Sequence, residues 1–352
     1  MKKIFNSSLN CVIIFIMNIR KIAKLCKVSP STVSRVLNHP ELVSTDTRDK
    51  ILSKLGEKEF TVRKYSKKQD INNNLVYFIY DANYEQLYSD MYRGFESILR
   101  SKNIYVSLCP IANDDIRRSY VIDMLCTTKC AGVIWALEEL HLEEINKFIK
   151  NNVPVILSRK YKDSPSELSN CYIDLSIVAT KMTDFLIKQD LNKVYLLLNT
   201  DNTYQESDIV EGFKMSFFAN KRKYNDKLVV KIKKTYENIV GELKKIISQD
   251  QKVDAFFCLD NDIAFMVINA LHEMKISVPK NISVVSFIDT KLSELCNPKI
   301  TSMDLSIKQL GIITAETLLK QIESRNTKYV KNVVVQPKIC IRESCKIKNR
   351  SE

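Results

Sequence analysis

A run of short polar side chains between residues 29 and 38 has the types and spacing of a helix that reads DNA. Ser29 is a natural N-cap and Pro30 suits the first helical position, so a short helix is expected to begin there. A short helix that is polar along one face fits the major groove, where arginine bonds guanine and hydroxyls contact bases or phosphates. The predicted DNA contacts on or beside this helix are Ser29, Ser31, Thr32, Ser34, Arg35 and Asn38.

Two further short helices are expected to hold the first one in place. One is capped by Asn18 and presents an apolar stripe from residue 19 to residue 26, and the other begins at the N-cap Ser44 and ends near Gly56. The three helices would share one small core. Asn18 and Thr47 complete the predicted contacts of this part. A bare pattern of this kind also fits an ordinary three-helix interaction module with a solvated basic face.

The basic charge of the chain is concentrated in the same segment. The 352 residues carry 54 Lys+Arg and 41 Asp+Glu, a formal net charge of +13, and residues 17–70 alone hold 13 basic and 6 acidic side chains. This excess favours an anionic partner. With 45% hydrophobic and 27% charged residues the composition is that of a globular protein of two or three domains, which excludes a mainly disordered, collagen-like or polytopic membrane protein.

Other kinds of chemistry have little support in the sequence. The ten cysteines include no CxxC pair, so they are interpreted as buried free thiols of a reducing cytoplasm. The three histidines lie far apart, and no glycine-rich loop follows any apolar strand in a chain with only six glycines. We therefore expect no cofactor, no metal site and no enzyme activity.

The first sixteen residues imitate the front of a signal peptide. Lys2 and Lys3 precede the apolar run 11–17, but this run is short, lacks a small-residue cleavage site and passes directly into a charged segment. No stretch approaches the roughly 20 apolar residues of a membrane span, so no membrane partner is expected. Our interpretation is that Met17 is the true start and that residues 1–16 are a non-native or disordered extension.

The string Val28-Ser29-Pro30-Ser31-Thr32-Val33-Ser34-Arg35-Val36-Leu37-Asn38, followed by Val43-Ser44, Thr47-Arg48 and Ile51, closely resembles the headpiece of the LacI/GalR family of bacterial transcriptional regulators. The resemblance implies a cytoplasmic protein that binds double-stranded operator DNA. Lys27 stands where the family usually has glycine, so a left-handed backbone is expected there at a cost of about 1 kcal/mol.

The hinge of this family normally offers a leucine that wedges into the minor groove, and this chain has none there. Lys64 and Tyr65 occupy the segment instead. Tyr65 could replace the wedge, or the lysines could hold phosphate without bending the duplex.

After residue 74 the chain alternates apolar strands with helical patterns. Repeated strand-helix units predict parallel sheets covered on both faces, with ligands beyond the carboxyl ends of the strands. The predicted strands are 75–80, 104–109, 131–135, 153–157, 193–198, 228–232, 255–258 and 283–287. The predicted helices are 89–100, 116–126, 142–150, 177–188, 208–219, 239–247, 263–274 and 307–322.

This region resembles the periplasmic-binding-protein-like core of LacI/GalR regulators, in particular at Gly94-Phe95, Glu211-Gly212-Phe213 and the closing Arg342-Glu343-Ser344. The expected fold is a small all-α helix-turn-helix headpiece followed by an α/β core of two parallel-sheet subdomains. The expected boundaries are 17–61 for the headpiece, 62–74 for the hinge, 75–174 plus 304–331 for the N-subdomain, and 175–303 plus 332–346 for the C-subdomain.

The same resemblance implies a homodimer and a small-molecule effector, often a sugar, in a cleft between the subdomains. The residues that match the effector positions are Asp81, Tyr88, Arg159, Gln205 and Asn261. Two departures weaken the sugar hypothesis: Ile209 replaces the usual arginine, and Asn261 replaces the usual aspartate. The expected function is an effector-controlled repressor. Alternatives are a regulator controlled by a protein partner or by no effector, an exported solute-binding receptor, and an enzyme on the same architecture.

Overall fold

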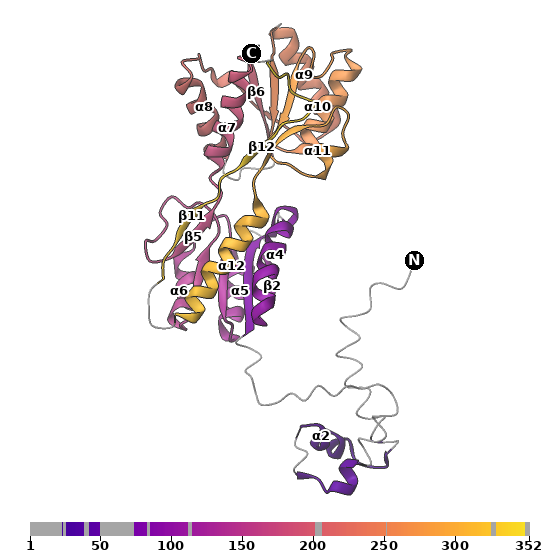
Figure 1. Cartoon of the computed structure of the whole chain (residues 1–352), viewed down its shortest axis with the longest axis vertical. Coiled ribbons are helices and arrows are strands. Elements are labelled where there is room, and N and C mark those ends of the chain that lie inside the picture. Colours follow the sequence, from indigo (N-terminus) through magenta and orange to yellow (C-terminus); the bar gives the residue numbers. More distant parts are fainter. Residues whose placement is uncertain are drawn as a thin grey trace. The chain divides into compact units, whose positions relative to one another are not determined.

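The computed structural model describes residues 23, 26–38, 42–49, 74–82, 85–111, 115–200, 206–250, 252–324 and 329–348. The chain divides into two compact units, Met1–Gln69 and Asp70–Glu352, which are described separately below (Figure 1). No helix within these described ranges is both long and apolar enough to cross a membrane.

The first unit is organised around the short helix α2, Pro30–Asn38. Val33 and Val36 are buried on one face of α2 and pack with Ala23 and Cys26. Residues 45–49 are also helical, and Ser44 begins this turn because its carbonyl accepts from the Arg48 N–H at 3.0 Å. The predicted sharing of one small core is therefore visible in the described part of this unit.

The turn before α2 has the strained backbone that the sequence predicts. Lys27 has φ 54°, in the left-handed region where a side chain is disfavoured. The Val28 N–H bonds the Ala23 carbonyl at 2.9 Å across this turn.

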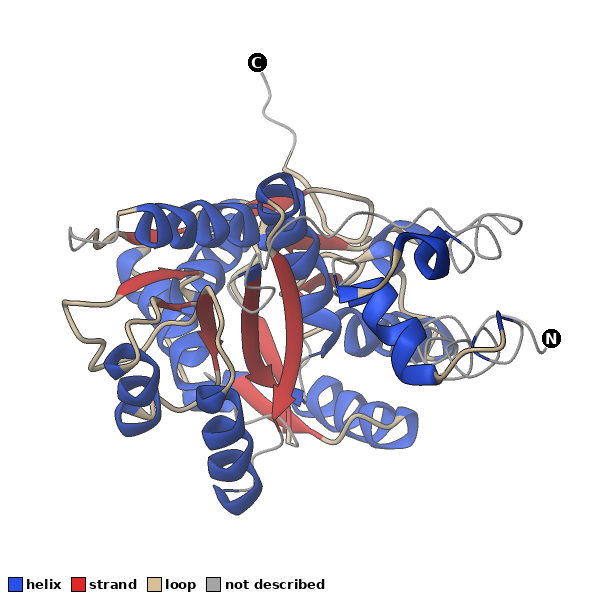
Figure 2. Cartoon of the chain, turned by 90° about the horizontal axis from the view of Figure 1, so that it is seen from below, coloured by secondary structure: helices blue, strands red, loops and turns tan. Residues whose placement is uncertain are grey.

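The second unit has two lobes, each built on a six-stranded sheet with helices on both sides of the strands (Figure 2). In the N-lobe the strand order is β11-β5-β4-β3-β1-β2, and all neighbouring strands pair in parallel. Its strands are β1 Leu75–Asp81, β2 Tyr105–Ile111, β3 Gly132–Ala136, β4 Val155–Leu157, β5 Ser169–Tyr172 and β11 Asn332–Val334. Its helices are α4 Glu85–Leu99, η4 Arg100–Lys102, α5 Asp115–Thr127, α6 Leu142–Lys150 and α12 Ile307–Glu323.

The central strand β1 shows why helices cover both faces of the sheet. Phe78 and Tyr80 pack on one face with residues of α4 and α12, whereas Tyr77 and Ile79 pack on the other face with residues of α5 and α6. Successive strand residues point to opposite faces, so a continuous apolar run requires two covering layers.

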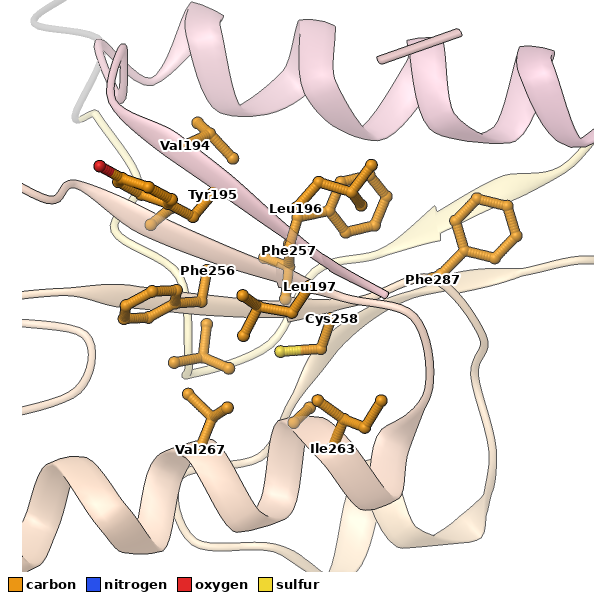
Figure 3. Packing of buried hydrophobic residues seen from close by; sticks show 14 of the residues in the cluster. Val194, Tyr195, Leu196, Leu197, Phe256, Phe257, Cys258, Ile263, Val267 and Phe287 are labelled. Carbon is orange, nitrogen blue, oxygen red and sulfur yellow. The ribbon is translucent and has the colours of Figure 1, made fainter. Parts of the chain in front are cut away.

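The C-lobe repeats the arrangement with the order β12-β10-β9-β8-β6-β7. Its strands are β6 Val194–Asn199, β7 Val229–Ile232, β8 Ala255–Cys258, β9 Ser283–Ser286, β10 Thr301–Asp304 and β12 Lys338–Cys340. Its helices are α7 Leu175–Lys188, α8 Glu206–Ala219, η5 Asp226–Leu228, α9 Tyr236–Gln249, α10 Asn261–Glu273 and α11 Lys291–Leu295. Figure 3 shows the interior of this lobe, where Ile263 and Val267 project from α10 toward the buried strands.

Two pairs of helices approach each other through glycine. A Cβ on Gly94 in α4 would lie 2.3 Å from the Lys308 carbonyl oxygen, and a Cβ on Gly212 in α8 would lie 2.1 Å from the Ser176 carbonyl oxygen. Both positions therefore exclude a side chain because backbone atoms occupy the space. The Gly-Phe pairs that the sequence singles out are thus helix contacts, with Phe95 and Phe213 fully buried beside them.

The chain crosses between the lobes three times, and the last crossing differs from expectation. Asn332 was expected to begin the C-subdomain, but β11 pairs with β5 of the N-lobe, so the crossing follows Val334. The short elements β5, β10, β11, β12 and α11 are absent from the prediction. The edge strand β12 is also antiparallel to β10, which departs from the expected all-parallel sheet.

Candidate nucleic-acid interface and effector site

The N-terminus of α2 gathers three of the predicted DNA-contacting residues. Ser29 caps the helix by accepting from the Thr32 N–H at 3.1 Å. Its hydroxyl also lies 2.7 Å from the Ser31 hydroxyl and 2.8 Å from the Thr32 hydroxyl. Ser29 and Ser31 are exposed. The helix start therefore presents a small set of hydroxyls together with its free backbone N–H groups, a combination suited to phosphate and base edges.

Arg35 follows one turn later and is exposed. Ser34 and Asn38 also lie within α2. Thr47 lies outside α2, in the helical turn after Ser44, and its hydroxyl accepts from the Ser44 hydroxyl at 2.9 Å. The predicted contacts Asn18, Lys64 and Tyr65, and the hinge departures with them, lie outside the described residues.

Three predicted effector residues come together at the carboxyl edge of the N-lobe sheet. The Tyr88 hydroxyl and the Arg159 Nη1 both donate to the Ala136 carbonyl at the end of β3, at 3.1 Å and 3.2 Å. Asp81 ends the neighbouring strand β1 and is 3% exposed. Because burial disfavours the phenolate, the pKa of Tyr88 is raised, although Arg159 opposes this effect. The strand order changes direction between β1 and β3, which is where folds of this type bind ligands.

Two neighbours of this cluster are absent from the sequence prediction. Glu138 follows the end of β3, much as Asp81 lies at the end of β1. Burial raises the pKa of Glu138 above its usual value, and Arg159 offsets part of this rise. Tyr161 donates to the Leu137 carbonyl at 2.6 Å, and burial raises its pKa. The rule that ligands lie beyond strand carboxyl ends could have identified Glu138. Tyr161 carries no such signal, because it lies on a loop.

The C-lobe provides a different set of groups at the matching edge. Asn261 begins α10 directly after β8, is 3% exposed and donates to the Thr290 hydroxyl at 2.7 Å. Its side-chain oxygen has no hydrogen-bond donor among the described residues. Ile209, the residue in place of the usual arginine, is 2% exposed and packs in the apolar core of this lobe. Gln205 lies outside the described residues.

A salt bridge joins the two lobes beside this edge. Lys160, which follows β4, lies 3.0 Å from Asp174 and 3.4 Å from Asp208 of α8. Burial alone would raise the pKa of Asp174, but bonds from Ser176 and Lys160 lower it below its usual value. The predicted Arg159 is therefore next in sequence to a residue that links the lobes.

Two cavities of the second unit are lined by residues other than the predicted effector residues. One of about 400 Å³ lies between Asp90 of the N-lobe and Ile288–Asp289 of the C-lobe. The other, of about 1340 Å³, lies at the opposite, amino edge of the N-lobe sheet, where Cys126 and Cys130 line it. Within the described ranges no group of His, Cys, Asp or Glu side chains is arranged to hold a metal ion.

The described cysteines are free thiols, buried or half-buried. Burial raises the pKa of Cys130 and of Cys345 to about 11. Such thiols are poor nucleophiles at neutral pH.

Two family models match the chain. Residues 18–61 match the model of bacterial regulatory proteins of the lacI family, and residues 183–345 match a periplasmic binding protein-like domain. The chain is 23% identical over 321 residues to catabolite control protein A of Priestia megaterium, covering 90% of this chain and 94% of that protein. It is 27% identical over 342 residues to the HTH-type transcriptional regulator RegA of Clostridium acetobutylicum, covering 94% and 99%.

A solved structure extends this likeness to the fold. The transcriptional regulator CelR-cellobiose complex superposes with a TM-score of 0.65 at 20% identity, covering 93% of this chain and 99% of that one. Residues 18–61 therefore resemble the DNA-binding part of lacI-family bacterial regulatory proteins, and the chain is a DNA-binding transcriptional regulator. The relatives are transcriptional regulators.

Proposed function

We propose that this chain is a homodimeric, cytoplasmic repressor that reads a pseudo-palindromic operator with α2 and is switched by a small molecule at the boundary between its lobes. The observation that carries the proposal is the start of α2. There Ser29, Ser31 and Thr32 gather their hydroxyls, and Arg35 extends into solvent one turn later. This placement supports base reading by Arg35 and phosphate anchoring at the helix start.

An exposed apolar surface on the N-lobe supports the homodimer. β2 is an edge strand whose Tyr105 and Leu108 are 63% and 46% exposed, and Tyr120 and Met124 of α5 are 74% and 52% exposed. Tyr120 and Met124 are four residues apart and so share one face of the helix. Large exposed apolar groups beside a free strand edge favour pairing with another chain. A second copy would supply the second headpiece that a two-half-site operator needs.

The effector proposal rests on the carboxyl edge of the N-lobe sheet. Tyr88 and Arg159 converge on one carbonyl there, Asp81 ends the adjacent strand, and Lys160 links this edge to the C-lobe. The related CelR structure is a complex with cellobiose. A ligand that binds one arrangement of the lobes more tightly than another would shift the operator-binding equilibrium by that difference in affinity.

The test begins with selection of operators from random duplex DNA by the full chain, followed by titration of the selected site. Arg35→Ala should weaken binding by about 1 to 3 kcal/mol and relax the preference at one base pair, because a bidentate contact to guanine is lost. Arg100→Ala is the matched control, because it removes one positive charge at an exposed position of the second unit, outside α2. Equal binding and equal selectivity of the Arg35 variant and the control would refute the role of α2.

A further inference from the structure

Lys160 is an N-lobe side chain that reaches two carboxylates on the C-lobe side of the boundary. Its ammonium lies 3.0 Å from Asp174, which caps α7, and 3.4 Å from Asp208 of α8. The three side chains are between 14% and 31% exposed, so solvent screens these contacts less than it screens surface ion pairs. Contacts of this kind form only in an arrangement of the lobes that keeps the charged groups within reach.

The two carboxylates are held in place relative to each other within the C-lobe. Asp174 accepts from the Ser176 N–H at 3.0 Å and from the Ser176 hydroxyl at 2.6 Å. α7 and α8 meet at Gly212, where a Cβ would lie 2.1 Å from the Ser176 carbonyl oxygen, and the Thr180 hydroxyl donates to the Gly212 carbonyl at 3.0 Å. Because these helices pack backbone against backbone, Asp174 and Asp208 should move together as a preformed pair of acceptors.

The chain next to Lys160 is fixed to the N-lobe sheet in a similar way. The Ser158 N–H bonds the Trp135 carbonyl at 2.8 Å, and the Ser158 hydroxyl donates to the Cys171 carbonyl at 3.2 Å. Lys160 therefore extends from a support that belongs to the N-lobe, and its ion pairs depend on where the C-lobe lies.

The rest of the boundary leaves the lobes room to move. Three single passages of the chain join them, after Tyr172, Asp304 and Val334. A cavity of about 400 Å³ lies between Asp90 of the N-lobe and Asp289 of the C-lobe. Lobes joined by a few backbone segments move about these segments as hinges unless side-chain contacts hold them. The contacts of one lysine can therefore bias the position of the lobes.

We infer that Lys160 is a latch that holds the two lobes together through Asp174 and Asp208, and that its release changes the affinity of the protein for operator DNA. The first part concerns the second unit alone, whereas the second part rests on the lobe-controlled switch proposed above. A ligand that favoured either the latched or the released arrangement would act on the same equilibrium.

Lys234 provides a matched control for this latch. It follows β7 and also lies between two carboxylates, Asp260 at 2.9 Å and Asp262 at 2.7 Å. Its side chain is 32% exposed, against 31% for Lys160. All three groups of the control belong to the C-lobe. Lys160→Met and Lys234→Met therefore remove the same charge and similar ion pairs, but only Lys160→Met cuts a link between the lobes.

The first measurement is the distance between the lobes of the full chain by double electron–electron resonance. Spin labels enter as noncanonical amino acids at the exposed positions of Lys150 in α6 and Lys188 in α7, and labelled chain is diluted with unlabelled chain. Lys160→Met should shift or broaden the distance distribution, whereas Lys234→Met should leave it unchanged. Lys160→Arg should retain the wild-type distribution, because a guanidinium also bonds two carboxylates.

Asp208→Asn cuts the same link from the C-lobe side. It leaves the Asp174 cap of α7 intact, so it decides the question even if Lys160→Met fails to fold. The double variant should be displaced no further than Lys160→Met alone, because the contact between the two residues is already lost.

The second measurement is titration of an operator that the wild-type chain selects from random duplex DNA. Lys160→Met should change the Kd by about threefold to tenfold, as expected of a partly buried lysine shared by two carboxylates, and Lys234→Met by less than about twofold. Both variants lose one positive charge, so any general effect of charge on DNA binding is the same in the two.

The outcomes separate the latch from the proposed function. If the label distance changes but the operator Kd does not, the latch does not control DNA binding and the second part is wrong. If Lys160→Met and Lys234→Met give the same distances, the latch itself is wrong, and operator binding by α2 stands. If the wild-type chain selects no operator, the proposed function fails, and the label distances still decide whether the latch exists.

Discussion

The two lobes of the second unit share a topology and differ in what they place at its functional edge. Both sheets have the same order of their first five strands, and both pack a helix pair through a glycine that meets backbone atoms. At the N-lobe edge, Tyr88 and Arg159 bond a main-chain carbonyl. At the C-lobe edge, the Asn261 side-chain oxygen has no donor among the described residues, and Ile209, at the position of the usual arginine, lies in the apolar core.

The comparison shows that the two lobes share their packing, whereas the polar residues at their edges differ. The glycine contacts and the apolar layers occur in both lobes because a closely packed interior has no room for larger side chains at these positions. The polar edge residues vary because they are held by a few hydrogen bonds and contribute little to the core. If the proposed effector site is correct, the N-lobe contributes polar groups already held by hydrogen bonds to its own backbone, and the C-lobe contributes Asn261.

The largest expected effect tests the shared scaffold. Gly94→Ala and Gly212→Ala should each destabilise the chain by about 3 kcal/mol, because the new Cβ meets a backbone oxygen that cannot move alone. Gly241→Ala in α9 is the control. Its Cβ would have nothing within 4 Å, so helix propensity should stabilise the chain by about 0.5 to 1 kcal/mol. Urea unfolding followed by circular dichroism measures all three. If only one of the two variants, Gly94→Ala or Gly212→Ala, lost much stability, the two helix contacts would not be equivalent.

The next effect concerns an ion pair of the C-lobe alone. Arg342 binds Asp289 through two bonds of 2.8 Å and 3.0 Å and also donates to Ser302 and to the Ile300 carbonyl. Arg342→Met should cost about 3 kcal/mol, because it leaves Asp289 half-buried without its cation. Burial alone would raise the pKa of Asp289, but the bonds from Arg342 lower it. The stabilisation is therefore present above the ordinary pKa of 3.8 and is lost as pH falls through the lowered value.

Lys348→Met provides the control for this ion pair. Lys348 bonds Asp190 at an exposed position, where solvent screens the ion pair and its loss should leave stability nearly unchanged. Thermal melts of the two variants between pH 3 and pH 7 distinguish them. If both lost stability equally, the special role of Arg342 would be refuted.

The smallest effect sharpens the description of the polar groups at the N-lobe edge. Tyr88→Phe removes the hydroxyl that bonds the Ala136 carbonyl and should cost about 1 kcal/mol. The loss is limited because Arg159 still donates to the same carbonyl. Tyr105→Phe, at a position 63% exposed, should leave unfolding unchanged. Identical denaturation curves for the Tyr88 variant and wild type would show that this bond does not hold these groups together.

Sequence patterns predicted the long elements, but among the strands of three or four residues they predicted β4, β7, β8 and β9 and missed β5, β10, β11 and β12. Strands such as β1 and helices such as α10 carry enough apolar residues to show their period, whereas β11 is three residues long and owes its place to pairing with β5. In the first unit, the cap at Ser29 was predictable because it depends on neighbouring residues alone, and the left-handed Lys27 was expected because the resembled family has glycine at this position. Thr47 and Arg35, by contrast, remain predictions as DNA contacts.

The effector residues show the same division. Asp81 and Asn261 were expected from the family resemblance, and the structure places Asp81 at the end of β1 and Asn261 shortly after the end of β8. Glu138 also follows a strand carboxyl end, but its charge environment depends on Arg159, which is distant in sequence. Ile209 was recognisable as a departure, while its burial in the core became apparent only when α8 was packed.

The sequence by itself determined the helix caps, the alternation of strands and helices, the glycine positions and the family resemblance, because each of these depends on residue type and local spacing. Only the tertiary structure decided which polar groups meet. Arg342 and Asp289 are 53 positions apart, and Tyr88 and Ala136 are 48 positions apart. Such pairs are set by the order of strands in the sheet and the registry of the covering helices, which local spacing does not encode.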